Sequence, residues 1–313
     1  MARFRLFRAL WAMVTTLAMH SAWSAEASPD QWERRTFHNP HEAAAILHSY
    51  KYGLQYWDAG DHSVPRLYIA WIPERWRNVY GPRAATSDKK RFFLFVFAPL
   101  ILRSNELILE ERRQLEVLLK KSTLSETDQK WLTNLAVEYG LAASDSTLDA
   151  SSIDRAELLA RVDAVPVSLA HAQAATESGW GTSRFADQGN ALFGQWTWSK
   201  SAMIPENARA ELGHYGVRAF ESPFHSIVAY MDNLNSHARY AKFRAARAAA
   251  RAAGKPASGL ELVDTLGAYS ERGADYVKDI RQMIRRNRLT EADGASLRTM
   301  TPVLFVPVGE QSR

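Results

Sequence analysis

Hydrophobic residues follow a helical period over most of the chain. Leucines recur at helical spacing among charged residues in 104–119, and the same spacing continues through 131–139. Further on, Ser258 and Glu261 form a capping box ahead of apolar positions that continue to 269, and 276–284 has one apolar face. These patterns predict a mainly α protein.

The first half of the chain is more mixed. Segment 64–72 has the β-branched and aromatic content of a short strand, which ends at Pro73. The apolar run 92–102 contains Pro99 and is too short to cross a bilayer, so it predicts a core strand or helix. A Ser-, Asp- and Ala-rich stretch at 142–152 is the best candidate for a linker or long loop.

Composition narrows the function classes. A chain of 313 residues with 46% hydrophobic residues can form one large or two ordinary globular domains. Its net charge of +5 suits an anionic partner, such as a wall polymer, a membrane surface or nucleic acid. There are no cysteines, which excludes disulfides and thiolate chemistry, and the nine histidines lack metal-binding spacing. No metal or cofactor is therefore expected.

The start of the chain has the features of an export signal. Arg3, Arg5 and Arg8 precede an apolar run at 9–19 that is too short to span a membrane, and small residues suited to cleavage follow at 22–27. We expect a signal peptide over 1–25 and a periplasmic location, with an uncleaved membrane anchor as the alternative. Export argues against nucleic acid as a partner, because only the positive charge of the chain supports it.

Glu177 is the candidate proton donor. Pro166 predicts the start of a helix that runs to about Ser178, where Gly179 ends it. Apolar neighbours and the negative end of the helix dipole would both raise the pKa of a carboxyl group in that last turn, as a general acid requires. Gln173, one turn earlier, could orient it. A solvated surface glutamate is the alternative on pattern alone.

Two runs around Glu177 carry a family resemblance. LAHAQAATESGWGTS at 169–183 and GNALFG at 189–194 resemble the signature of the bacterial glucosaminidase family, and in particular its Bax-type members from Gram-negative bacteria. Weaker similarity covers much of 40–290. The resemblance implies cleavage of β-1,4 bonds after N-acetylglucosamine in peptidoglycan glycan strands, with Glu177 as the catalytic acid.

The resemblance also implies an architecture. It predicts a lysozyme-like helical domain with a small β-hairpin lobe at 151–290. A mixed α/β accessory region at 26–150 would precede this domain, and a tail at 291–313 would follow it. Nothing in the sequence predicts an oligomeric state.

Further site residues follow from the same resemblance. Asn190 and its neighbours to Gly194 match the stretch that lines the family's cleft. Tyr269 and Tyr276 resemble the family's Tyr-Ala-Thr-Asp-x-x-Tyr element, whose first tyrosine is a cleft residue, so the resemblance implies a catalytic-site role for Tyr269. Glu271 and Arg272 replace the Thr-Asp of that element, so a core tyrosine is the alternative for Tyr269.

The second catalytic group is not fixed by the sequence. Glycosidases usually pair the acid with another carboxylate. In the family, a second glutamate lies in the β-lobe; Glu206 is the first choice here, and Glu211 and Glu221 are the alternatives. A substrate-assisted mechanism, in which the sugar's own acetamido group attacks, is the further alternative.

Aromatic and basic residues complete the expectations. Sugar-binding rings are expected among Trp180, Phe193, Trp196, Trp198 and Tyr240, with core packing as the alternative for each. Arg244, Arg247 and Arg251 share one helical stripe, for which we expect a solvated face. The alternative for this stripe is peripheral contact with anionic lipid or wall phosphate.

Two other functions fit the same scaffold. A lytic transglycosylase also uses one glutamate but releases anhydromuramyl ends; its usual Gly-Leu-Met-Gln element is absent, and 190–194 stands in its place. A non-catalytic wall-binding protein is the second alternative.

Overall fold

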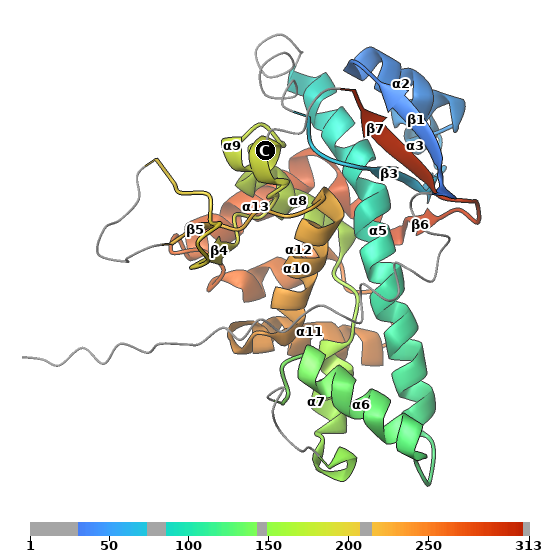
Figure 1. Ribbon diagram of the computed structural model, residues 1–313, viewed down its shortest axis with the longest axis vertical. Coiled ribbons are helices and arrows are strands. Elements are labelled where there is room, and N and C mark those ends of the chain that lie inside the picture. Colours follow the sequence, from blue (N-terminus) through green and yellow to red (C-terminus); the bar gives the residue numbers. More distant parts are fainter. Residues whose placement is uncertain (1–30, 74–85, 143–148, 207–214, 309–313) are drawn as a thin grey trace, which may run out of the picture.

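The computed structural model describes residues 31–73, 86–142, 149–206 and 215–308. Helices make up most of it and the strands are few and short, which confirms the mainly α fold (Figure 1). The expected signal peptide lies outside the described residues.

Helix α5, Thr86–Leu119, runs along the long axis of the molecule (Figure 1). It begins well ahead of the expected start at Ser104 and continues through Pro99, although proline has no N–H to donate to the Phe95 carbonyl. Burial on several sides outweighs this loss, because Phe93, Phe97 and Leu100 are fully buried. The apolar run 92–102 is therefore a core helix.

By length and composition, α5 is the one helix among the described residues that could cross a membrane. However, 78% of its apolar window is buried inside the protein. Neighbouring elements therefore already cover the apolar surface that makes the helix resemble a span.

Strands from both ends of the chain form one small parallel sheet. Strand β7, Val303–Pro307, lies between β1, Glu33–Phe37, and β3, Leu67–Ile69. Beside it, β2, Ser63–Val64, pairs with β6, Ser296–Leu297. The strand expected at 64–72 is thus divided between β2 and β3. Residues from the expected accessory region and the expected tail share these sheets.

The remaining helices include α8, Val167–Glu177, which carries the candidate acid at its end. Ser258 caps its helix as the sequence predicts, Asp154 caps the helix that follows it, and Pro223 occupies a first-turn position. The bounds are α2 Pro40–Ser49, α3 Leu54–Asp58, α6 Glu126–Glu138, α7 Arg155–Arg161, α9 Arg184–Gly189, α10 Pro223–Ser236, α11 Ala241–Ala252, α12 Gly259–Leu262 and α13 Ala274–Arg286; the 3-10 turns are η3 Ala150–Ser152, η5 Ala238–Tyr240, η6 Val263–Leu266 and η7 Leu289–Gly294.

Nine of the eleven residues of α8 are buried, and its neighbours are α5, α12, α13 and η7. At its first turn, the carboxylate of Asp293 accepts hydrogen bonds from the backbone N–H and hydroxyl of Ser168 at 2.8 and 2.7 Å. A Cβ at Gly259 would lie 2.3 Å from the Ser168 hydroxyl oxygen, so this close packing requires glycine. The helix that ends at Glu177 is therefore held firmly at its start.

A small antiparallel hairpin projects beside this helical core. It consists of β4, Trp196–Thr197, and β5, Gly216–Val217, and Met203 bridges to Val217 at its edge. A β-hairpin here agrees with what the family resemblance implies; residues 207–214 of its connection lie outside the described residues.

Candidate active site

Glu177 is the last residue of α8, as predicted. Ser178 caps the helix, and Gly179 follows with φ +58°, a left-handed conformation that suits glycine. The Ser178 hydroxyl donates to the Ala174 carbonyl at 2.6 Å and accepts from the Gly181 N–H at 2.8 Å. The turn after Glu177 is therefore tied back to the helix, which limits the movement of the half-buried carboxyl group.

A chain of hydrogen bonds leads from the protein interior to this carboxyl group. The Tyr230 hydroxyl donates to Gln173 Oε1 at 2.6 Å, and Gln173 Nε2 donates to the Tyr276 hydroxyl at 2.9 Å. The Tyr276 hydroxyl in turn donates to Glu177 Oε1 at 2.8 Å. Gln173 thus positions Glu177 through Tyr276 rather than by direct contact.

Aromatic rings enclose this hydrogen-bonded chain. Tyr269 stacks on Tyr276 with ring centres 5.4 Å apart, and Tyr240 lies 6.1 Å from Tyr269. On the other side, Phe193 stacks on Tyr230 at 3.9 Å with nearly parallel planes. Side chains far apart in the sequence therefore form one aromatic cluster around the acid.

The environment of Glu177 suits a proton donor. Burial raises the pKa of the Glu177 carboxyl, while the hydrogen bond from Tyr276 and the charge of Arg272 oppose that rise. Arg272 is itself engaged with Asp279 at 2.5 Å. The side chains that act on the pKa of Glu177 are thus those of Tyr276 and Arg272, neither of them a carboxylate.

Other rings extend outward from this centre. Trp180 is half-buried; its ring meets Phe93 edge-on at 5.6 Å, and Lys90 Nζ lies 5.3 Å from its centre. On the hairpin, Trp196 and Trp198 are 49% and 60% exposed, an unusual state for large apolar side chains. Both rings therefore present exposed aromatic surface to solvent.

Comparison with known proteins matches the region around Glu177 to a known family. Residues 153–289 match the Glucosaminidase family, described as mannosyl-glycoprotein endo-beta-N-acetylglucosaminidase. The chain is also 32% identical over 202 residues to Protein bax of Escherichia coli (strain K12), a match covering 64% of this chain and 71% of that protein. The chain belongs to the glucosaminidase family. It is thus a glycan-cleaving hydrolase of Bax-like type. No solved structure shows significant similarity to it.

The two candidates for the second carboxylate that the structure describes have partners other than Glu177. Glu206 has a side chain that is 84% exposed, and its Oε1 lies 4.0 Å from Arg184 Nε. Glu221 is exposed, and its backbone carbonyl accepts from Asn190. Glu211 lies outside the described residues. The second group therefore stays a prediction.

Asn190, which the resemblance assigns to the cleft, is fully buried with φ +51°. Its Oδ1 accepts from the Ile72 N–H at 2.9 Å, and its Nδ2 donates to the Phe220 and Glu221 carbonyls at 3.1 and 3.2 Å. Asn190 thus joins the N-terminal region to the segment after the hairpin, a clear structural reason for an asparagine here.

Sequence reasoning missed several residues of the site. Tyr230, the inner end of the hydrogen-bonded chain, lies on the buried face of α10. A tyrosine at an apolar position of a helix usually has a hydrogen-bond partner for its hydroxyl, and this pattern could have identified Tyr230 from the sequence. Tyr215, whose ring lies 4.9 Å from that of Trp196, and Lys90 carried no comparable signal.

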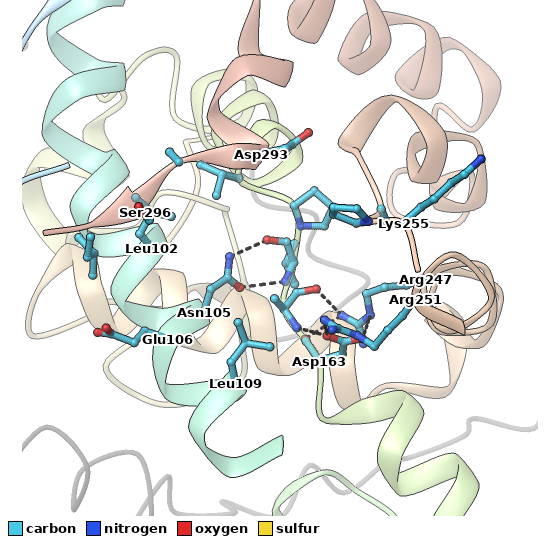
Figure 2. Close-up of a pocket in the computed structure, with 18 of the residues that line it drawn as sticks. Leu102, Asn105, Glu106, Leu109, Asp163, Arg247, Arg251, Lys255, Asp293 and Ser296 are labelled. Atoms are coloured by element: carbon cyan, nitrogen blue, oxygen red, sulfur yellow. Dashed lines mark hydrogen bonds and ion pairs between the residues drawn. The ribbon is translucent and has the colours of Figure 1, made fainter. Parts of the chain in front are cut away.

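The expectation of a solvated arginine face is wrong. Arg244 and Arg247 are only 1% and 2% exposed. Both guanidinium groups satisfy backbone carbonyls at the ends of neighbouring helices, and Arg251 pairs with the buried Asp163 (Figure 2). Because these carbonyls have no partner inside a helix, a buried cation is stable beside them.

Arg247 and Arg251 border a cavity of about 610 Å³ between α5, the segment before α8 and the end of α11 (Figure 2). Asn105 exchanges two hydrogen bonds with the Val165 backbone along its wall. Glu177 does not line this cavity. No group of three or more His, Cys, Asp or Glu among the described residues is placed to hold a metal ion.

Proposed function

We propose that this glucosaminidase hydrolyses the β-1,4 bond after N-acetylglucosamine in peptidoglycan, with Glu177 as the general acid. The observation that carries the proposal is the carboxyl group of Glu177, which is desolvated and held by Tyr276. A raised pKa favours the protonated form of Glu177, which can donate its proton to the leaving glycosidic oxygen. Tyr269 and Tyr240 would border the sugar beside the acid.

A general acid alone supplies roughly 10²–10⁴ in rate, which is less than a glycosidase needs. The attacking group would be either water activated by Glu206 or the acetamido oxygen of the substrate. The Glu206 side chain is 84% exposed and lies 4.0 Å from Arg184, which favours the acetamido group. The exposed Trp196 and Trp198 would bind pyranose faces farther along the glycan.

The same observation also fits a lytic transglycosylase, because the reaction of that enzyme class uses one carboxyl group as well. In it, a hydroxyl of the muramyl sugar attacks instead of water. The two reactions leave different ends: a reducing N-acetylglucosamine for the hydrolase and an anhydromuramyl end for the transglycosylase.

Digestion of purified peptidoglycan tests the proposal. Wild-type protein should release muropeptides with reducing N-acetylglucosamine ends, and Glu177→Gln should lower the rate by about 10²–10⁴. Glu206→Gln, an equally conservative change at an exposed site, separates the mechanisms: a similar loss identifies the second carboxylate, and unchanged activity favours the acetamido group. Full activity of Glu177→Gln would refute the role of Glu177, and anhydromuramyl ends would identify a transglycosylase.

A further inference from the structure

A second cavity, of about 500 Å³, lies between the N-terminal region and the family domain. Tyr52 and Trp57, before and within α3, form one wall, and Phe95 of α5 forms another. His171 of α8 and Arg286 of α13 complete it. This volume falls within the range of small-molecule sites.

Two polar atoms in its buried wall have no hydrogen-bond partner among the described residues: His171 Nδ1 and the Tyr52 hydroxyl. Both side chains are 2% exposed. His171 Nε2 lies 3.1 Å from the Leu94 carbonyl oxygen, which can only accept, so Nε2 carries the proton and Nδ1 is a free acceptor. Burial lowers the pKa of His171 to about 4 and keeps the ring neutral.

Buried polar groups without partners are rare because they cost folding free energy. The walls around these two atoms are aromatic or apolar and include Trp57, Leu94 and Phe95. A matching ligand therefore carries a hydrogen-bond donor for His171 Nδ1, an acceptor for the Tyr52 hydroxyl, and small apolar groups. An amide group has the required donor and acceptor together.

The rim of the cavity is positively charged. Lys90, Arg91, Arg286 and Arg288 line it against only two carboxylates, those of Asp58 and Glu291. Both carboxylates already pair with Arg288, at 3.2 and 2.7 Å. The rim therefore favours an anionic group on the ligand.

We propose that this cavity binds a short peptide with free carboxylates, such as the stem peptides attached to peptidoglycan glycan strands. The proposal rests on the proposed function, because the strand cleaved at Glu177 would supply the peptide. Lys90 connects the two places: it lines the cavity, and its Nζ lies 5.3 Å from the ring of Trp180, three residues after Glu177. The N-terminal region would then recognise the peptide while the family domain cleaves the glycan.

Calorimetric titration of the full chain with the synthetic tripeptide L-Ala-γ-D-Glu-diaminopimelate tests the proposal. Binding should weaken with salt and fall at least tenfold when the peptide carboxylates are amidated. Tyr52→Phe removes only a hydroxyl that has no partner in the free protein, so it should fold normally and bind about three- to tenfold more weakly. Arg286→Gln should also weaken binding, whereas Arg285→Gln is the matched control: it is exposed on the same helix, does not line the cavity, and should bind as wild type.

No binding of either peptide, equal binding of the amidated peptide, or full affinity in Tyr52→Phe would each overturn the proposal. Peptide binding needs no catalysis, so it can succeed or fail independently of the Glu177→Gln digestion. As a second measurement, Tyr52→Phe should reduce kcat/KM on intact peptidoglycan about three- to tenfold but leave it unchanged on glycan stripped of its peptides. Equal loss on both substrates would also contradict a peptide site.

Discussion

Replacing Tyr276 by phenylalanine tests how the protein holds its acid. The change keeps the ring that stacks on Tyr269 but removes the hydroxyl, which donates to Glu177 at 2.8 Å and accepts from Gln173 at 2.9 Å. Each such bond contributes roughly 0.5–1.5 kcal/mol net, so two give about 1–3 kcal/mol. Gln173 is fully buried and its Nε2 would lose this acceptor. We therefore expect unfolding in urea to show a loss of about 2–3 kcal/mol.

The same variant should change the pH dependence of catalysis. Glu177 must be protonated to donate, so activity falls as pH rises through its pKa. The hydrogen bond from Tyr276 lowers that pKa, while burial raises it. Removing the hydroxyl leaves burial less opposed, so the pKa rises and the alkaline limb of the kcat/KM profile moves to higher pH.

Tyr230→Phe is the matched control, because Tyr230 donates to Gln173 and makes no hydrogen bond to Glu177. It should cost about 1–2 kcal/mol of stability, since Gln173 Oε1 loses its donor, and leave the alkaline limb in place. If the limb of Tyr276→Phe moved to lower pH, or moved equally in both variants, the account of Glu177 as an acid tuned by Tyr276 would be wrong.

Three further predictions concern stability and glycan binding. Glu177→Gln should stabilise the protein at pH 7 by up to about 2 kcal/mol, because the raised pKa of Glu177 means that its ionisation costs stability above pH 4.5. In urea unfolding this gain in stability should disappear near pH 4. The exposed Glu206→Gln should show no gain at either pH. Arg247→Met should lose about 3–5 kcal/mol, because the carbonyls of Ala160 and Ala164 lose their donor. Arg113→Met, 69% exposed, should change unfolding by less than about 0.5 kcal/mol, and equal effects would contradict the structural role of Arg247. Trp198→Ala should raise KM for glycan about fivefold with kcat nearly unchanged; a loss confined to kcat would place Trp198 in the chemistry instead.

Local signals in the sequence predicted where Glu177 lies. Pro166 precedes the helix and Gly179 follows it, so these start and stop signals alone predicted that Glu177 lies in the last turn. The caps at Asp154 and Ser258 were predictable for the same reason, because a cap and its partner lie within three residues.

Long-range partners could not be predicted in this way. Tyr230, Gln173 and Tyr276 come from three helices, and their hydrogen bonds join residues 57 and 103 positions apart. The arginine stripe shows the same limit. Helical spacing reveals which side chains share a face but not that the face meets unpaired carbonyls, so Arg247 was expected in water. Pro99 shows that burial can outweigh a local helix-breaking signal.

The family match covers 153–289, yet the surroundings of Glu177 depend on residues outside that range. His171 of α8 hydrogen-bonds the Leu94 carbonyl, and Trp180 packs against Phe93; both partners lie on α5. At the other end of α8, Asp293 binds the first turn. These contacts fix the position of the helix that carries Glu177 and of the turn that follows it. The N-terminal region is therefore part of the structural frame around Glu177, whether or not it also binds peptide.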